Sequence, residues 1–166
     1  MAKIMEIKVK NFTEEYIKDA IRIWNEVVKD GVAFPQIECL DEKTGLEFFK
    51  EQSYTGLAFD GEDIVGLYIL HPNNVGRCGH ICNASYAVDS TKRGKHIGEY
   101  LVKDCMEKAR ELNFRILQFN AVVSTNTGAL KLYKRLGFTQ LGTIPNGFLM
   151  KDGTYQDIIP HYIELT

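Results

Sequence analysis

Residues 86–112 constrain the fold of this chain most strongly. They read as the end of a strand, a short basic turn and a long amphipathic helix, and the apolar residues of that helix recur at helical spacing: Ile97, Leu101, Cys105, Ala109 and Leu112. The first backbone N–H groups of such a helix have no partner within it, and the helix dipole places positive charge there. The sequence therefore predicts an anion site at this helix N-terminus.

The turn supplies the residues of this candidate site, which are Arg93, Gly94, Lys95, His96, Ile97 and Gly98. Basic and small residues at a helix start suit a phosphate or a pyrophosphate. The chain has no Gly-x-x-x-x-Gly-Lys-Ser/Thr run, and its glycines here lack the spacing of a dinucleotide-binding turn. A purely structural turn is the alternative, because Gly and Lys are common wherever a strand turns into a helix.

A second predicted helix, over residues 126–136, could form another wall of the same site. Asn126, Ala129 and Tyr133 are separated by three and four residues and therefore share one helix face. The small Ala129 leaves room for a ligand beside that face. In the alternative interpretation, Asn126 only caps the helix and Tyr133 only packs in the core.

The composition is that of one ordinary globular domain, spanning residues 1–166. The chain is 45% hydrophobic and 25% charged, and its 20 basic and 22 acidic residues give a net charge of −2. This balance argues against a nucleic-acid or anionic-membrane surface. The first ten residues lack the apolar core of a secretory signal, and no apolar run reaches membrane-spanning length, so a cytoplasmic location is expected.

The cysteines are expected to be free thiols, since a chain of this size does not need disulfides; they are Cys39, Cys78, Cys82 and Cys105. Cys78, His80 and Cys82 alternate, which could suggest a metal site. Their spacing is not that of a zinc knuckle and a second cysteine pair is missing. We therefore expect no metal: on a strand, residues 78, 80 and 82 would share one face, so these three could simply be packing residues.

The order of predicted elements indicates an α/β or α+β layered domain with a mixed sheet. Predicted strands cover residues 3–10, 55–59, 64–70, 81–88, 115–123, 138–144, 148–151 and 154–165. The first predicted helix begins at Thr13 and ends at Gly31. A second begins at a Thr44–Glu47 capping box, and two more cover residues 97–112 and 126–136. Gly66, inside the third of these strands, suggests the close approach of another backbone.

The turn and the second helix together resemble the acyl-CoA-binding motifs of the GNAT (Gcn5-related) N-acetyltransferase superfamily. In that family the pattern Arg/Gln-x-x-Gly-x-Gly/Ala binds the pyrophosphate of coenzyme A through backbone N–H groups. Residues 93–98 match at Arg93 and Gly98 and depart at His96, where the family usually has Gly. The family pattern Asn-x-x-Ala-x-x-x-Tyr-x-x-x-Gly-Phe matches completely over residues 126–138.

The resemblance implies an α/β (α+β) fold with a mixed, mostly antiparallel central sheet flanked by helices on both faces. It also implies acetyl-CoA as cosubstrate, bound by residues 93–98, Asn126, Ala129 and Tyr133, together with Ala87 and Val88 at the end of the preceding strand. In the family a bulge in that strand separates it from its neighbour and frees backbone donors. The matching donor here is Val88.

The implied reaction is direct attack of an amine on the thioester of acetyl-CoA. The carbonyl oxygen that becomes negative needs a preorganised donor, which the resemblance assigns to the backbone of Val88. The departing thiolate, with a pKa near about 8.5, can take a proton from a phenol. The resemblance assigns that role to Tyr133.

The attacking amine must be neutral, so a base or a chain of waters is required. The sequence offers four candidate bases and does not rank them: Glu38, His71, Asp89 and His80. Trp24, Phe34 and Tyr155 could line the acceptor pocket, and each could equally be a core residue.

Residues 23–35 resemble the branch of the family that acetylates phosphinothricin and amino-acid analogues. The expected partner is therefore an amine acceptor, a small molecule or a peptide, with no nucleic acid and no membrane. The exposed strands of the C-terminal hairpin would also allow pairing with a second copy of the chain. The alternatives are a CoA-binding module without turnover and a nucleotide-phosphate-binding enzyme.

Overall fold

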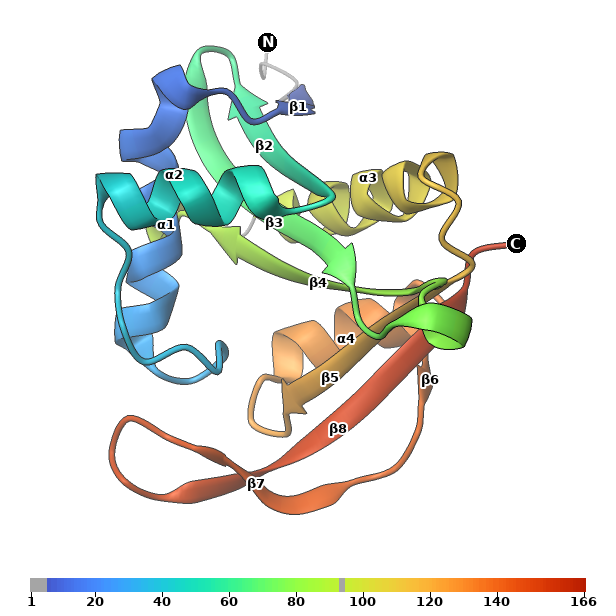
Figure 1. The fold of residues 1–166 in the computed structure, drawn as a ribbon. Coiled ribbons are helices and arrows are strands. Elements are labelled where there is room, and N and C mark those ends of the chain that lie inside the picture. Colours follow the sequence, from blue (N-terminus) through green and yellow to red (C-terminus); the bar gives the residue numbers. More distant parts are fainter. Residues whose placement is uncertain (1–5, 93–94) are drawn as a thin grey trace, which may run out of the picture.

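We analysed a computed structural model, in which residues 6–92 and 95–166 are described (Figure 1). The strands are β1 Ile7–Asn11, β2 Tyr54–Asp60, β3 Asp63–Pro72, β4 Ile81–Val88, β5 Ile116–Val123, β6 Thr139–Gln140, β7 Ile144–Leu149 and β8 Tyr155–Glu164. The α-helices are α1 Ile17–Asp30, α2 Glu42–Glu51, α3 Ile97–Glu111 and α4 Thr127–Arg135. Short 3-10 turns cover Glu14–Tyr16, Gly76–Cys78 and Ser90–Lys92.

The strands form one sheet in the order β1-β2-β3-β4-β5-β8-β6, and β7 pairs with β8. Each described pair is antiparallel except β4 and β5, which are parallel. The chain crosses between these two strands through α3. The predicted mixed, mostly antiparallel sheet is confirmed.

Helices cover both faces of the sheet, as predicted (Figure 1). Along β3, Leu67 and Ile69 belong to the core beneath α1 and α2, whereas Tyr68 and Leu70 belong to the core beneath α3. The alternation of side chains along a strand thus divides the interior into two layers.

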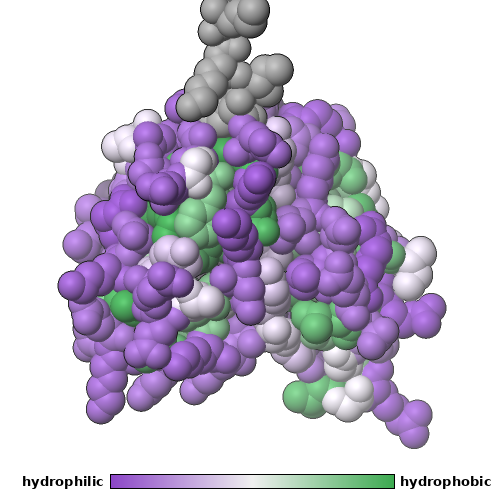
Figure 2. Space-filling view, turned by 90° about the horizontal axis from the view of Figure 1, so that it is seen from above, coloured by the Kyte–Doolittle hydropathy of each residue, from purple (hydrophilic) through white to green (hydrophobic). Residues whose placement is uncertain are grey.

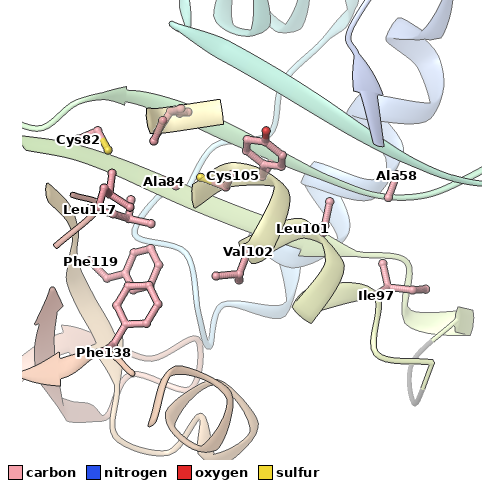
Figure 3. Close-up of a cluster of buried hydrophobic side chains, with 14 of the residues drawn as sticks. Ala58, Cys82, Ala84, Ile97, Leu101, Val102, Cys105, Leu117, Phe119 and Phe138 are labelled. Carbon is pink, nitrogen blue, oxygen red and sulfur yellow. The ribbon is translucent and has the colours of Figure 1, made fainter. Parts of the chain in front are cut away.

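Figure 3 shows part of the core beneath α3 and α4. Leu101 and Cys105 of α3 are fully buried there against strand residues such as Leu117. The rings of Phe119 and Phe138 stack with centroids 4.9 Å apart. This aromatic contact attaches the chain after α4 to the middle of β5. Figure 2 shows the outside of the molecule from above, where hydrophobic residues form limited patches within a mainly hydrophilic surface.

Two of the predicted helix starts are wrong in detail. The side chain of Asp41, not that of Thr44, caps α2: it accepts from the Thr44 N–H at 2.7 Å, and the Thr44 hydroxyl accepts from the Asp41 N–H at 2.9 Å. Thr13 caps no backbone group and precedes a 3-10 turn, so α1 begins later. The predicted end at Gly31 is confirmed, because this residue adopts the left-handed conformation with φ 64°.

The predicted strand over residues 138–144 is also wrong, because only Thr139–Gln140 pairs there. Gly142, with φ 132°, turns the chain out of the β6 pairing, and β7 starts at Ile144. The predicted hairpin turn at residues 60–63 and the limits of β4 are confirmed.

Cys78, His80 and Cys82 do not share a strand face. Cys78 lies exposed in a 3-10 turn, His80 precedes β4, and Cys82 is buried within it. No group of metal-binding side chains occurs among residues 6–92 and 95–166. All four cysteines are free thiols, as predicted. No helix in the described ranges is both long and apolar enough to span a membrane.

Gly66 allows β3, β4 and α3 to approach closely, as its position in a strand suggested. A Cβ atom there would lie 2.9 Å from the carbonyl oxygen of Ala87 and 3.1 Å from Leu101. We expect Gly66→Ala to lower the free energy of unfolding by about 1–3 kcal/mol, because the neighbouring backbone must move. Denaturant unfolding measures this change.

The matched control is Gly128→Ala, since a Cβ atom at Gly128 would meet nothing within 4 Å. In the first turn of α4 this substitution should leave the free energy of unfolding unchanged or raise it by up to about 1 kcal/mol. Equal effects of the two substitutions would contradict the assignment of close packing to Gly66.

Candidate active site

The parallel strands β4 and β5 separate soon after they begin. They pair only at Ile81–Ile116 and Cys82–Leu117, and Figure 1 shows them diverging beyond that point. The expected bulge in β4 is absent, because β4 pairs with β3 in continuous register as far as Val88. The irregularity lies in β5 instead, where its register with β8 shifts between Phe119 and Val122.

The register leaves the N–H of Val88 facing this gap. Asp89 donates its N–H to the carbonyl of Val65 at 2.9 Å, which makes these two opposite residues a hydrogen-bonded pair. Antiparallel pairs alternate, so Val88, opposite Gly66, directs its N–H and C=O away from β3 and toward the side of β5. Ala87 has the other orientation: its backbone faces β3 and its side chain is buried in the α1 layer.

A cavity of about 600 Å³ lies where the end of β4 meets the N-termini of α3 and α4. Val88, His96, Ile97 and Gly98 line it, and the end of α1 closes the opposite side. The first intrahelical bond of α3 is donated by Tyr100, so the preceding N–H groups at this helix start have no intrahelical partner.

Gly98 suits the close approach of a ligand. A Cβ atom there would meet only Leu132, at 3.8 Å, and would otherwise project into open space beside the cavity. Lys95 is exposed and does not line this cavity. Arg93 and Gly94, which were also predicted to bind the anion, lie outside the described residues.

His96 is the N-cap of α3 and adopts the left-handed conformation, with φ 58° and ψ 24°. This region costs an L-residue roughly 1–2 kcal/mol, whereas glycine enters it freely. The left-handed backbone conformation therefore explains why the family usually has glycine at this position. The His96 side chain is exposed and borders the cavity.

Two basic residues that the motifs did not indicate, Lys92 and Arg135, also line the large cavity. Arg135 of α4 contacts Glu99 of α3 at 3.3 Å, and Lys103 contacts the same carboxylate at 3.6 Å. The hydrogen bond from Arg135 holds the pKa of Glu99 below its ordinary value. This ion pair joins the start of α3 to the end of α4 beside the cavity.

A smaller cavity of about 170 Å³ lies between the diverging strands. Ala129 and Tyr133 of α4 line it, and so do Phe34 and Pro35 from the loop after α1. Burial raises the pKa of Tyr133, so its phenol stays protonated at neutral pH. Its ring packs on Phe119 with centroids 4.5 Å apart.

Asn126 connects the two cavities, since it lines both. Its side chain accepts from the N–H of Ala129 at 3.3 Å, which confirms the N-cap interpretation. The predicted set of Asn126, Ala129 and Tyr133 is thus brought together on the helix face that borders the gap.

Two of the three aromatic candidates for the acceptor pocket lie elsewhere. Trp24 is 1% exposed and packs against Phe34 in the α1 layer, with ring centroids 4.5 Å apart. Tyr155 is 58% exposed on β8 and lines neither cavity. Phe34 alone of these three aromatic residues borders the gap.

None of the four candidate bases, which are Glu38, His71, His80 and Asp89, lines either cavity. The Asp89 carboxylate accepts from the Thr91 N–H at 2.9 Å, from its hydroxyl at 2.8 Å and from Arg22 at 3.0 Å. Burial opposes ionisation of Asp89, but these hydrogen bonds outweigh it and lower its pKa. Asp89 therefore fixes the turn after β4 and is poorly suited to accept a proton.

Comparison with known proteins identifies the family of the chain. The model of the acetyltransferase (GNAT) family matches residues 11–138. The chain belongs to the GNAT family. The match includes both cavities' principal walls, from the loop after α1 to the end of α4.

Individual relatives agree with the family assignment. N-acetyltransferase aca1 of Schizosaccharomyces pombe is 35% identical over 88 residues, which are 53% of this chain and 42% of that protein. A GCN5-related N-acetyltransferase from Kribbella flavida superposes with a TM-score of 0.87 and 28% identity, over 95% of this chain and 97% of the other. A GNAT superfamily phosphinothricin acetyltransferase from Sinorhizobium meliloti, in complex with AcCoA, gives a TM-score of 0.88 at 18% identity, over 96% and 89%.

The chain thus spans less than half the length of its fission yeast relative. The Sinorhizobium structure, at its low identity, supports the fold. The predicted recognition of the GNAT superfamily is confirmed by the family model, and the resemblance to the phosphinothricin acetyltransferase-like branch stays a prediction.

Several residues that line the two cavities were not indicated by the sequence motifs: Ala33, Asn83, Ser85, Tyr86, Lys92, Asn120, Thr125 and Arg135. A signal for some of them is present in the sequence. Asn83 and Ser85 alternate with apolar residues in β4, as Gln118 and Asn120 do in β5. Polar residues with period two in otherwise apolar strands indicate one open face.

We expect His96→Gly to raise the free energy of unfolding by about 1 kcal/mol, because it removes the left-handed penalty at the α3 N-cap. Denaturant unfolding gives the value. His80→Gly is the matched control, because it changes an exposed histidine whose φ is not positive. It should lower the free energy of unfolding by about 0.4–1 kcal/mol. A loss of stability in both variants would refute this account of His96.

We expect Asp89→Asn to cost about 1–3 kcal/mol of stability at pH 7, because the carboxylate's bonds to Arg22 and Thr91 are weakened. The folded pKa of Asp89 is lowered. Its contribution is therefore complete above the unfolded pKa of about 3.9 and is lost as the pH falls through the folded pKa.

Denaturant unfolding of both proteins from pH 7 to acid pH measures this dependence. The difference between wild type and Asp89→Asn should shrink in the acid range, while Glu62→Gln in the exposed hairpin turn should show little difference at any pH. A difference that stays constant on acidification would contradict the assigned role of the carboxylate.

Proposed function

We propose that this GNAT chain is an acetyl-CoA-dependent N-acetyltransferase, which transfers the acetyl group to the amine of a small molecule or a peptide by direct attack in a ternary complex. The observation that carries the proposal is the gap between β4 and β5. The register directs the N–H of Val88 toward that gap, and Tyr133 lines the cavity within it.

The residues of the large cavity fit the diphosphate part of coenzyme A. The start of α3 offers N–H groups without intrahelical partners, and Gly98 leaves space in front of them. Lys92 adds positive charge at the wall, where Arg135 is paired with Glu99 of the same lining. Asn126 stands where the two cavities meet, so the thioester end would reach the gap beside it.

In the reaction, the amine nitrogen forms a bond to the acetyl carbon and the carbon–sulfur bond breaks. The N–H of Val88 would donate to the carbonyl oxygen as it becomes negative, a role that a fixed backbone donor performs without reorganisation. Tyr133 would donate its proton to the departing sulfur. Burial disfavours a tyrosinate, but the same dry surroundings disfavour a free thiolate.

The neutral amine must also lose a proton after attack. Because none of the four candidate bases lines either cavity, we propose that water carries this proton away through the open side of the gap and that the Tyr133 phenolate regains a proton from the same water. A cytoplasmic location and pairing of two copies through the β7–β8 hairpin also stay predictions from the sequence.

We expect Tyr133→Phe to lower kcat roughly 10²-fold or more with a productive amine, because the general acid is lost. Thiol release from acetyl-CoA over a panel of amines gives kcat. Thermal stabilisation by CoA should persist, since the ring still packs on Phe119. The matched control is Tyr100→Phe on the exposed part of α3, which should retain the wild-type kcat.

Two results would refute this proposal. If Tyr133→Phe kept the wild-type kcat, the acid would be another group. If CoA stabilised the protein but no amine released thiol from acetyl-CoA, the chain would be a CoA-binding module without turnover.

A further inference from the structure

The loop between α1 and α2 contains a segment with little support of its own. Residues 32–39, which we call the strap, have no regular secondary structure and make no hydrogen bond to any described residue. Within the strap only Phe34 is buried, at 7% exposure. Its ring packs on Trp24 of α1 with centroids 4.5 Å apart. A segment with so few contacts opens locally at low cost in free energy.

The chain is anchored just before and just after the strap. Before it, the carbonyl of Gly31 accepts from the N–H of Lys151 at 3.1 Å. After it, Asn25 of α1 holds Leu40 by two hydrogen bonds: Nδ2 donates to the Leu40 carbonyl at 2.8 Å, and Oδ1 accepts from the Leu40 N–H at 2.8 Å. An amide supplies this donor and this acceptor together. The first anchor joins two backbones, whereas the second depends on a single side chain.

The middle of the strap separates two cavities. Phe34 and Pro35 line the smaller cavity in the gap between β4 and β5. The same two residues line a third cavity, of about 450 Å³, beside residues 147–151, where β7 ends. In the described part of the chain, no residue of β4, β5, α3 or α4 lines this third cavity. The strap therefore has space on both sides, and its position sets the width of the gap at Phe34 and Pro35.

We propose that Asn25 is a positioning residue for the acceptor side of the site. By holding Leu40, it keeps Phe34 and Pro35 in the wall of the gap; without it, the strap moves toward the third cavity. Only protein with the strap in place encloses an acceptor, so the apparent affinity for the acceptor falls with the fraction of protein in that state. The consequence for catalysis rests on the proposed acetyl transfer, whereas the anchoring of the strap does not.

The larger cavity depends less on this anchor. The strap residues that line it, Val32 and Ala33, directly follow Gly31, and the backbone anchor at Gly31 stays in place when Asn25 is changed. The helix starts on the other side of that cavity lie outside the strap. Loss of Asn25 should therefore weaken binding of the acceptor and leave binding of the cosubstrate nearly unchanged.

The first experiment uses Trp24, the single tryptophan of the chain, as a reporter of the strap. Its side chain is 1% exposed, packs against Phe34 and lines none of the three cavities. In Asn25→Ala, the constant for quenching of its fluorescence by acrylamide should rise about threefold to tenfold, because two hydrogen bonds that hold the strap are lost. Asn25→Gln keeps the amide on a stem that is one methylene longer, so it should reverse part of this increase.

Two controls separate release of the strap from other causes. Glu26→Ala truncates the neighbouring, equally half-buried side chain of α1 and should leave the quenching constant unchanged. Gly66→Ala crowds the layer beneath α3, so it should lower the melting temperature without raising the quenching constant. A wild-type quenching constant in Asn25→Ala, or an equal increase in Asn25→Ala and Glu26→Ala, would overturn the proposal.

The second experiment measures thiol release from acetyl-CoA with the amine of the panel that reacts fastest. In Asn25→Ala, the KM for this amine should rise about threefold to tenfold, while kcat and the KM for acetyl-CoA stay within about twofold of the wild-type values. An equal rise of both KM values, or a fall of kcat alone, would overturn the positioning role. If the wild-type protein released no thiol with any amine, the proposed function would fail, and the quenching of Trp24 would still decide whether Asn25 anchors the strap.

Discussion

The separation of β4 from β5 is the constraint on which the rest of the site depends. A parallel pair normally continues its ladder, and unpaired backbone N–H groups inside a sheet are costly. Here each strand keeps its other neighbour: β4 stays in register with β3, and β5 pairs with β8. The two halves of the sheet are therefore stable without the missing ladder, and the free edge of β4 can serve a ligand.

Side chains hold this gap open from both faces. On the α4 face, Tyr133 contacts Phe119 and Phe138 and lies edge-on to His161, so an aromatic cluster fills the space behind the diverging strands. On the other face, Asn83 reaches the backbone of Gln118 and replaces one ladder bond by a side-chain bond. The gap is thus a packed feature of the sheet, which suits a site that must be preorganised.

Local sequence signals predicted most helices and strands well. Features that depend on pairing between distant strands were not predicted. The turn at residues 60–63, the limits of β4 and the helix end at Gly31 follow from turn and capping chemistry within a few residues. The early end of β6 depends on its contact with β8, which periodicity does not contain. For the site, the α4 residues followed from helical spacing, whereas Asn83 and Asn120 required the knowledge that their strands are neighbours.

The geometry also separates the two binding tasks of the proposed enzyme. The groups suited to the cosubstrate are backbone N–H groups and cations at the ends of α3 and α4, and they depend on helix starts such as the left-handed His96. The smaller cavity, between β4 and β5, is lined by uncharged side chains in the described part of the chain. Because alternate residues of a strand face opposite layers, the acceptor face can change without disturbing the core beneath α3. In the proposed enzyme, acceptor preference would therefore depend on these two strands together with the loop after α1, while the site for the cosubstrate would depend mainly on the helix starts.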